Sequence, residues 1–160
     1  MEANKIIITG GATRIGAVIA EKLSGPGKEI VIHFNKSKSN AEKLKKELSK
    51  NGTKIYLVKA DLGKEEDINK IIKFAKSKLK YFDCLINNAS LFENDKLDNF
   101  TTNSWGRHLR TNLRTPALLS KEFAKNTIGK NNKMYPKGRS TMGMPGTRAQ
   151  KGKKKWKQIK

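Results

Sequence analysis

Short apolar runs and stretches of helical spacing alternate along the first 125 residues. Four runs, each short and rich in Ile, Val or Leu, are typical of buried strands and lie at 5–9, 29–34, 54–59 and 84–87. Apolar residues recur at helical intervals elsewhere, which predicts helices near 15–23, 41–48, 68–79 and 109–123, the last with Pro116 as a candidate kink. This alternation predicts an α/β fold with a doubly wound parallel sheet. Ligands of such sheets bind beyond the carboxyl ends of the strands, so function is sought there.

Composition divides the chain near Asn126. Of 160 residues, 35 are Lys or Arg and 14 are Asp or Glu, a formal net charge of +21. Residues 1–125 hold 24 of the basic residues and every acidic one, whereas 126–160 hold 11 basic residues and no acid. The second segment also has few hydrophobic residues and no regular period, which predicts disorder. We therefore expect one domain at 1–125 and a basic, disordered or aberrant tail at 126–160.

Several classes of protein are excluded by what the sequence lacks. Its apolar runs fall far short of the roughly 20 residues that span a bilayer. Its N-terminus has no basic-then-apolar signal pattern. Cys84 is the only cysteine, which excludes an internal disulfide framework and a multi-cysteine zinc site. We expect a cytoplasmic protein with no membrane segment and no bound metal.

The first predicted strand ends in a glycine-rich turn that leads into a helix. Residues 9–16 read Thr-Gly-Gly-Ala-Thr-Arg-Ile-Gly. Small residues let the backbone approach a pyrophosphate, and the helix that follows offers free N–H groups and the positive end of its dipole. A plain strand-to-helix connection is the alternative. The position after the first strand and before a helix favours a cofactor phosphate.

The loop after the second strand carries cations where an acid is common. Sites for NAD place a carboxylate here to accept hydrogen bonds from the ribose 2′-hydroxyl, but no acid occurs between Glu29 and Glu42. Lys36 and Lys38, with neighbouring amide and hydroxyl side chains, suit a 2′-phosphate instead, and Arg14 could reach the same phosphate. A solvated loop in a Lys-rich protein is the alternative. We favour NADP over NAD.

The third and fourth strand ends carry polar groups with two interpretations each. Asp61 could accept a hydrogen bond from an adenine amino group or cap the helix that follows. Residues 87–90, Asn-Asn-Ala-Ser, could tie neighbouring strands or bond a ribose. Phe92 could stack on a flat heterocycle, although a loop aromatic is more often simply packed.

Together these motifs resemble the N-terminal part of a short-chain dehydrogenase/reductase. Four motifs occur in the family's order: the glycine loop (Thr9, Gly10, Gly16), the adenine-binding acid (Asp61), the Asn-Asn-Ala motif (87–90) and the helix asparagine of the catalytic tetrad (Asn112). Arg14 stands where the family has its middle glycine, and Ser90 where its third motif ends in glycine. The resemblance covers residues 4–125. It implies a truncated Rossmann-like sheet with strand order 3-2-1-4 and a catalytic role for Asn112.

Three features resemble pteridine reductases and members similar to dihydromonapterin or dihydrofolate reductase. They are Arg14 in the glycine loop, His-Phe-Asn-Lys-Ser at 33–37 after the second strand, and Asn-Ala-Ser at 88–90 followed by Phe92. That resemblance implies hydride transfer from NADPH to a pterin-like or other carbonyl or imine substrate, with Phe92 against the pterin. It also implies that full-length relatives form homo-oligomers. It places the cofactor against Gly10, Arg14, Ile15, Gly16, Asn35, Lys36, Ser37, Asp61, Leu62, Asn88, Ala89 and Ser90.

The family's catalytic Tyr-x-x-x-Lys pair has no match, since Tyr135 is followed four residues later by Arg139. We expect little or no turnover, no fifth strand after residue 126, and an unpaired edge on the fourth strand. The tail has two interpretations. The favoured one is the aberrant end of an interrupted reductase. The alternative is a module without catalysis that binds a nucleotide, or binds nucleic acid through its cations with Trp156 stacked on a base.

Overall fold

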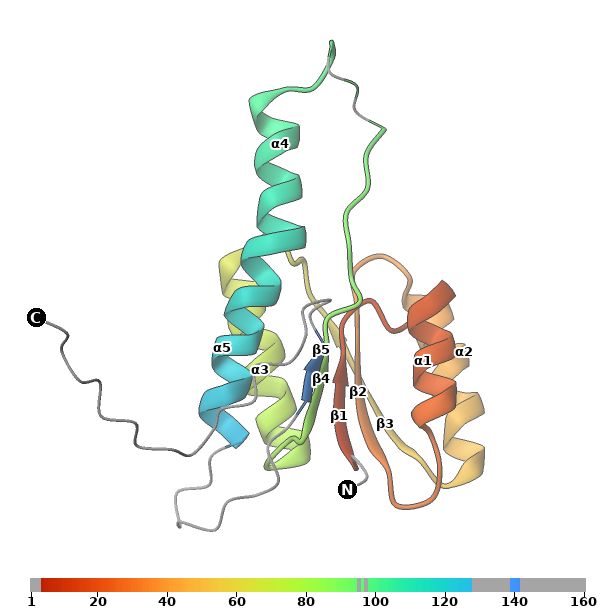
Figure 1. The fold of residues 1–160 in the computed structure, drawn as a ribbon. Coiled ribbons are helices and arrows are strands. Elements are labelled where there is room, and N and C mark those ends of the chain that lie inside the picture. Colours follow the sequence, from red (N-terminus) through yellow and green to blue (C-terminus); the bar gives the residue numbers. More distant parts are fainter. Residues whose placement is uncertain (1–3, 95, 97, 128–138, 142–160) are drawn as a thin grey trace, which may run out of the picture.

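A parallel sheet forms the centre of the molecule in the computed structural model, which describes residues 4–94, 96, 98–127 and 139–141 (Figure 1). Its strands are β1 (Lys5–Ile8), β2 (Glu29–Phe34), β3 (Lys54–Lys59), β4 (Cys84–Ile86) and β5 (Arg139–Thr141). They lie in the order β3-β2-β1-β4-β5, and every pairing is parallel. The predicted fold class and the order 3-2-1-4 of the first four strands are confirmed.

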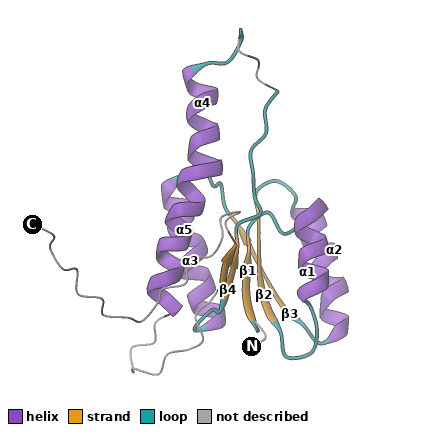
Figure 2. Cartoon of the chain, in the orientation of Figure 1, coloured by secondary structure: helices purple, strands orange, loops and turns teal. Residues whose placement is uncertain are grey.

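Helices cover both faces of this sheet (Figure 2). One face carries α1 (Arg14–Leu23) and α2 (Lys38–Leu48), which a short turn η1 (Ser49–Asn51) follows; the other carries α3 (Glu65–Leu79) and α5 (Thr115–Thr127). Successive residues of β1 serve opposite layers: Ile6 and Ile8 pack with α1 and α2, and Ile7 packs with α3 and α5. Burial of both faces is typical of parallel strands and explains why the strands read as continuous apolar runs.

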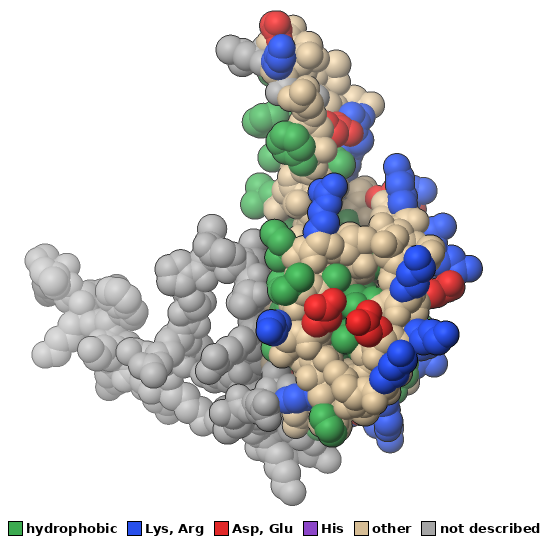
Figure 3. Space-filling view, turned by 90° about the vertical axis from the view of Figure 1, so that its right-hand side faces the viewer, with side chains coloured by type: hydrophobic (Ala, Val, Ile, Leu, Met, Phe, Trp, Pro, Cys, Tyr) green, Lys and Arg blue, Asp and Glu red, His purple; other side chains and the backbone are tan. Residues whose placement is uncertain are grey.

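One helical rod projects beyond the sheet, formed by α4 (Thr102–Leu109), a π-helical turn η2 (Arg110–Arg114) and α5 in succession. A capping box formed by Thr101 and Ser104 starts α4. Hydrophobic side chains lie exposed along the rod, whereas Lys and Arg are spread over the face that carries α1 and α2 (Figure 3). None of the helices in the described ranges is long and apolar enough to cross a membrane.

The π-helical turn lies where the sequence predicts a kink. Pro116 has no N–H to donate, and a proline ring crowds the carbonyl group four residues earlier, here that of Asn112. The π-helical turn just before Pro116 is wider than an α-helical turn, so it accommodates the proline ring while the helix continues into α5.

The expectation that no fifth strand follows residue 126 is wrong. β5 pairs with the outer edge of β4, with Cys84 opposite Arg139 and Ile86 opposite Thr141. The free backbone groups of an edge strand pair with an extended segment whatever its side chains are. Because Arg-Ser-Thr contains no apolar residue, the hydrophobic pattern gave no sign of this strand. The expectations for the rest of the tail, Trp156 included, fall on 128–138 and 142–160, outside the described residues.

The contribution of α5 to stability can be tested with two leucines on the rod. Leu119 is fully buried, whereas Leu113 on η2 is 58% exposed. Leu119→Ala should lower the free energy of unfolding by about 2–5 kcal/mol, because it removes apolar contacts and leaves a cavity. Leu113→Ala should change it by less than about 0.5 kcal/mol. Urea denaturation followed by circular dichroism measures both, and equal effects would contradict the packing of α5 on the sheet.

Candidate functional site

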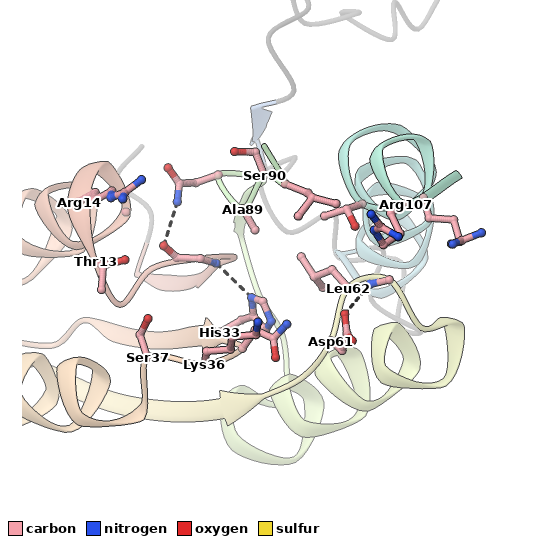
Figure 4. A pocket seen from close by; sticks show the side chains of 18 of the residues that line it. Thr13, Arg14, His33, Lys36, Ser37, Asp61, Leu62, Ala89, Ser90 and Arg107 are labelled. Carbon is pink, nitrogen blue, oxygen red and sulfur yellow. Dashed lines mark hydrogen bonds between the residues drawn. The ribbon is translucent and has the colours of Figure 1, made fainter. Parts of the chain in front are cut away.

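The carboxyl ends of β1 to β4 open into one cleft of about 980 Å³ (Figure 4). That volume lies at the upper end of the range for small-molecule and cofactor sites. The turn between β1 and α1, the ends of β2 and β3, the segment after β4, α4 and η2 supply its walls. Every residue predicted to bind the cofactor lines it: Gly10, Arg14, Ile15, Gly16, Asn35, Lys36, Ser37, Asp61, Leu62, Asn88, Ala89 and Ser90.

Thr9 and Asn88 fasten the ends of β1 and β4 together. The Thr9 hydroxyl Oγ1 accepts hydrogen bonds from the backbone N–H groups of Asn88 and Ala89, both at 3.1 Å. In return, Asn88 Nδ2 donates to the carbonyl oxygens of Thr9 and Gly10, both at 3.0 Å. Thr9 is only 1% exposed, so water cannot replace these bonds. Of the two interpretations of the asparagine motif, the tie between strands is the one seen for Asn88.

The glycine turn packs closely against this clasp between β1 and β4. Gly10 has a left-handed φ of +60°, and a Cβ there would lie 2.9 Å from the Ala89 Cα. A Cβ on Gly16 would overlap the Gly10 carbonyl oxygen. α1 starts directly after Thr13, whose side chain makes no capping bond, and its first turn holds no acid. The N-terminus of α1 therefore presents N–H groups and a positive dipole end to the cleft.

Cations and hydrogen-bond donors border the same end of the cleft. Arg14 is exposed and has a left-handed φ of +50°, a conformation that costs a non-glycine residue about 1–2 kcal/mol. Lys36 is also exposed and comes from the loop after β2 (Figure 4). Ser37 lies at the N-cap of α2, but its hydroxyl makes no capping bond. Arg14 is the first residue of α1, Lys36 and Ser37 come from the connection between β2 and α2, and all three line the cleft.

His33 is a cleft residue that sequence reasoning missed. It is buried near the end of β2, where its Nδ1 accepts a hydrogen bond from the Gly10 N–H at 3.1 Å and its Nε2 lies 3.1 Å from the Ala60 carbonyl oxygen. Burial lowers the pKa of His33 below its usual 6.5, against smaller opposing effects of Ala60, Asp67 and Asp61. The only sequence signal was a polar residue inside an apolar strand.

Asp61 holds the turn after β3. Its Oδ1 accepts a hydrogen bond from the Gly63 N–H at 2.9 Å, and its own N–H donates to Asp67 Oδ2 at 2.6 Å. The carboxylate thus holds the turn that precedes α3, but it does not cap that helix, whose N-cap residue is Lys64. The predicted capping role of Asp61 is therefore not seen, and its role toward an adenine stays a prediction. The adjacent Leu62 carbonyl oxygen accepts from the Thr115 hydroxyl at 2.6 Å, which ties α5 to this wall of the cleft.

Asn112 and Phe92 lie outside the cleft lining. Asn112 Oδ1 accepts from the Leu91 N–H at 2.7 Å, and its Nδ2 donates to the Leu91 carbonyl oxygen at 2.8 Å. This pair of bonds fixes the segment just beyond Ser90 to the helical rod. Phe92, the next residue, is 86% exposed. The structure therefore brings the predicted cofactor residues together in one cleft, whereas Asn112 and Phe92 are not part of its lining.

The wall formed by α4 and η2 adds charged residues that sequence reasoning also missed. Arg107 donates to both carboxylate oxygens of Glu93, at 3.2 and 2.7 Å, and Arg110 lines the cleft nearby. Arg107 was missed because α4 was not predicted, whereas Arg110 lies in the predicted helix 109–123, and nothing in the sequence placed it at the cleft. Together with Arg14, Lys36 and Lys64, they give the cleft more cations than acids, and this balance attracts anions.

Comparison with known proteins identifies the family. The sequence profile of short chain dehydrogenases matches residues 4–133. The chain belongs to the short-chain dehydrogenase/reductase family. It is 34% identical over 113 residues to the short-chain dehydrogenase/reductase FrzI of Cladobotryum sp., a match that covers 71% of this chain and 44% of the relative. With versicolorin reductase stcU of Emericella nidulans it shares 26% over 122 residues, or 76% and 46%. It spans about half the length of these relatives.

Solved structures of short-chain dehydrogenases share this fold and bind NADP. FolM alternative dihydrofolate reductase 1 from Brucella canis, complexed with NADP, has a TM-score of 0.71 and 32% identity over 78% of this chain and 50% of that one. A short chain dehydrogenase from Burkholderia cenocepacia in complex with NADP has a TM-score of 0.73 and 25% identity, over 77% and 50%. The predicted family is confirmed, and the FolM enzyme is one structural neighbour among several.

Two substitutions at Thr9 test the clasp in this short-chain dehydrogenase domain. Thr9→Val keeps the side-chain shape but leaves the N–H groups of Asn88 and Ala89 without their acceptor, which should lower the free energy of unfolding by about 2–4 kcal/mol. Thr9→Ser keeps the hydroxyl and should cost only about 1 kcal/mol for the lost methyl group. Urea denaturation gives both values, and a serine variant as unstable as the valine variant would refute the role of the hydroxyl.

Proposed function

We propose that this chain is the cofactor-binding part of an NADP(H)-dependent short-chain reductase that transfers hydride to a pterin-like or other carbonyl or imine substrate. The observation that carries the proposal is the acid-free end of the cleft, where Arg14, Asn35, Lys36 and Ser37 flank the N-terminus of α1. A site selective for NAD places a carboxylate after β2. Cations and hydroxyl donors in that place suit the 2′-phosphate of NADP.

The residues fit a dinucleotide along the whole cleft. Gly10 and Gly16 allow the turn to pack tightly, because a Cβ at either position would clash with the backbone of Ala89 or of Gly10. This compact turn leaves the N–H groups at the start of α1 available to a pyrophosphate. Asp61 and Leu62 would border the adenine. Ile15 and residues 88–90 would border the nicotinamide half. When bound, NADPH supplies the hydride, and the protein's part is to hold and orient it.

The pterin-like substrate is supported by two observations. The FolM neighbour, named as an alternative dihydrofolate reductase, shares 32% identity with this chain. Phe92 offers an exposed ring two residues after Ser90, and the paired bonds of Asn112 to Leu91 hold the intervening backbone. We propose that Asn112 positions Phe92 and that Phe92 stacks on a flat heterocycle at the open end of the cleft.

A module that binds the nucleotide without turnover is the second candidate. It is favoured by the sequence around Tyr135, which has Arg139 rather than lysine four residues later. In the family's Tyr-x-x-x-Lys pair, the lysine lowers the pKa of the tyrosine, and the tyrosine passes the proton that accompanies hydride transfer. The two candidates share one cofactor site, and in the second candidate nucleotide binding alone is the function.

Selectivity for NADP can be tested at Lys36. Lys36→Asp should weaken NADPH binding by about 10–100-fold, because a charge-assisted contact is lost, and should strengthen NADH binding through the new carboxylate. Fluorescence titration with each nucleotide measures both affinities. Lys38→Asp is the matched control: it makes the same change in charge, but Lys38 pairs with Glu42 on α2 at 3.7 Å and does not line the cleft. Equal effects of the two substitutions would refute the 2′-phosphate site.

A turnover assay tests the expectation that this chain by itself is inactive. This chain, mixed with NADPH and a dihydropterin, should consume NADPH no faster than the mixture without protein, because no tyrosine in its sequence is followed by lysine four residues later. Absorbance at the reduced nicotinamide band follows the reaction. A titration of NADPH binding on the same sample distinguishes absent chemistry from absent binding, and ordinary turnover would favour the reductase as the chain stands.

A further inference from the structure

We propose that His33 is a positioning residue for the glycine turn and makes dinucleotide binding dependent on pH. The inference rests on the proposed function, since it concerns the same cofactor site. His33 touches neither phosphate nor nicotinamide in this scheme and acts only through the turn that it holds.

His33 holds two successive N–H groups of the turn. Its side chain accepts from the Gly10 N–H at 3.1 Å, and its backbone carbonyl oxygen accepts from the Gly11 N–H at 3.1 Å. Its other ring nitrogen, Nε2, lies 3.1 Å from the Ala60 carbonyl oxygen at the end of β3. At 2% exposure, one imidazole thus links the ends of three neighbouring strands out of contact with water.

These bonds require the neutral ring in one tautomer. Because the Gly10 N–H points at Nδ1, that nitrogen must carry a lone pair, and the single proton lies on Nε2, from which it donates to Ala60. A second proton on Nδ1 would set two donors against each other. Gly10 would then lose the bond that orients its left-handed backbone, and the same residue also accepts from Asn88 in the clasp. Protonation therefore disturbs the turn that receives the pyrophosphate.

Burial and the charged groups near His33 determine the pH at which the ring takes up the second proton. Asp61 after β3 and Asp67 on α3 favour the charged ring, but each carboxylate already accepts a hydrogen bond from a backbone N–H group. Burial acts in the opposite direction and is the larger effect, so the pKa of His33 lies below 6.5. The ring is thus neutral near pH 7, and affinity for the dinucleotide should fall as the pH drops below 6.5 through the lowered pKa.

Two amide substitutions separate the two ring bonds. In His33→Asn the amide lies at the position of Nδ1 and can accept from Gly10 but cannot reach Ala60. In His33→Gln it lies near the position of Nε2 and can donate to Ala60 but not accept from Gly10. At about pH 8, NADPH affinity should stay within about threefold of wild type in His33→Asn and fall about tenfold in His33→Gln, the effect of one hydrogen bond.

A second experiment measures the NADPH affinity of wild type and of His33→Asn from about pH 8 to about pH 4.5. The cofactor phosphate titrates equally with both proteins, so the ratio of their NADPH affinities isolates His33. Below the lowered pKa, we expect the NADPH affinity of wild type to fall relative to that of His33→Asn by up to about tenfold per pH unit. A ratio that stays constant across this range overturns the inference, and so do equal affinities of the two variants at pH 8.

The design distinguishes failure of the inference from failure of the proposed function. No NADPH binding by wild type at about pH 8 would overturn the proposed function and this inference with it. Normal binding with a flat pH ratio would overturn the inference alone. Urea denaturation of each variant establishes that it is folded. If His33→Gln does not fold, the pH dependence of NADPH affinity in wild type and His33→Asn still tests the inference.

Discussion

The clasp between Thr9 and Asn88 is the interaction on which the rest of the site depends. Its hydrogen bonds set the spacing between the ends of β1 and β4 at the point where both strands leave the sheet. Gly10 fits between the two strand ends only because it has no Cβ. Its carbonyl oxygen accepts a hydrogen bond from Asn88 and lies so close to Gly16 that a Cβ on Gly16 would overlap it. The start of α1 follows directly from that turn. The direction in which α1 presents its N–H groups to the cleft is thus fixed by bonds between two strands.

Most of the fold could be predicted because buried strands and helices leave a regular trace of apolar residues. The bounds of β2 and β3 agree with the apolar runs, and α3 differs only by the acidic first turn that precedes Ile68. Two elements left no such trace. α4 projects beyond the core, so little of it packs against a partner that would impose a period. β5 pairs with β4, but its sequence, Arg-Ser-Thr, has no apolar residue and could form a loop equally well.

The site divides in a similar way. The glycines could be predicted, because a tight turn needs particular residue types at fixed positions along the chain. Asp61 could be placed at the end of β3, but its bond to Gly63 in the turn before α3 could not. His33 could not be predicted, because its role depends on Gly10 and Ala60, which lie 23 and 27 residues away, just beyond the ends of β1 and β3. Arg14 is a second residue whose position the sequence pattern does not explain. Its left-handed backbone fits a position where the family has glycine, and no local pattern explains why a strained arginine stands there.

Fold and site share the same bonds, so cofactor binding and stability must be coupled. A dinucleotide that binds only the folded chain raises its free energy of unfolding in proportion to the logarithm of ligand concentration over Kd. The turn that would receive the pyrophosphate is also the turn that joins β1 to α1. A change that loosens this turn should weaken binding and folding together. A substitution of Lys36, in contrast, should have little effect on stability, because its exposed side chain borders the cleft from outside the core. Residues of the clasp and residues proposed to contact the 2′-phosphate are therefore separable by experiment: substitutions of the former should alter both binding and stability, and substitutions of the latter binding alone.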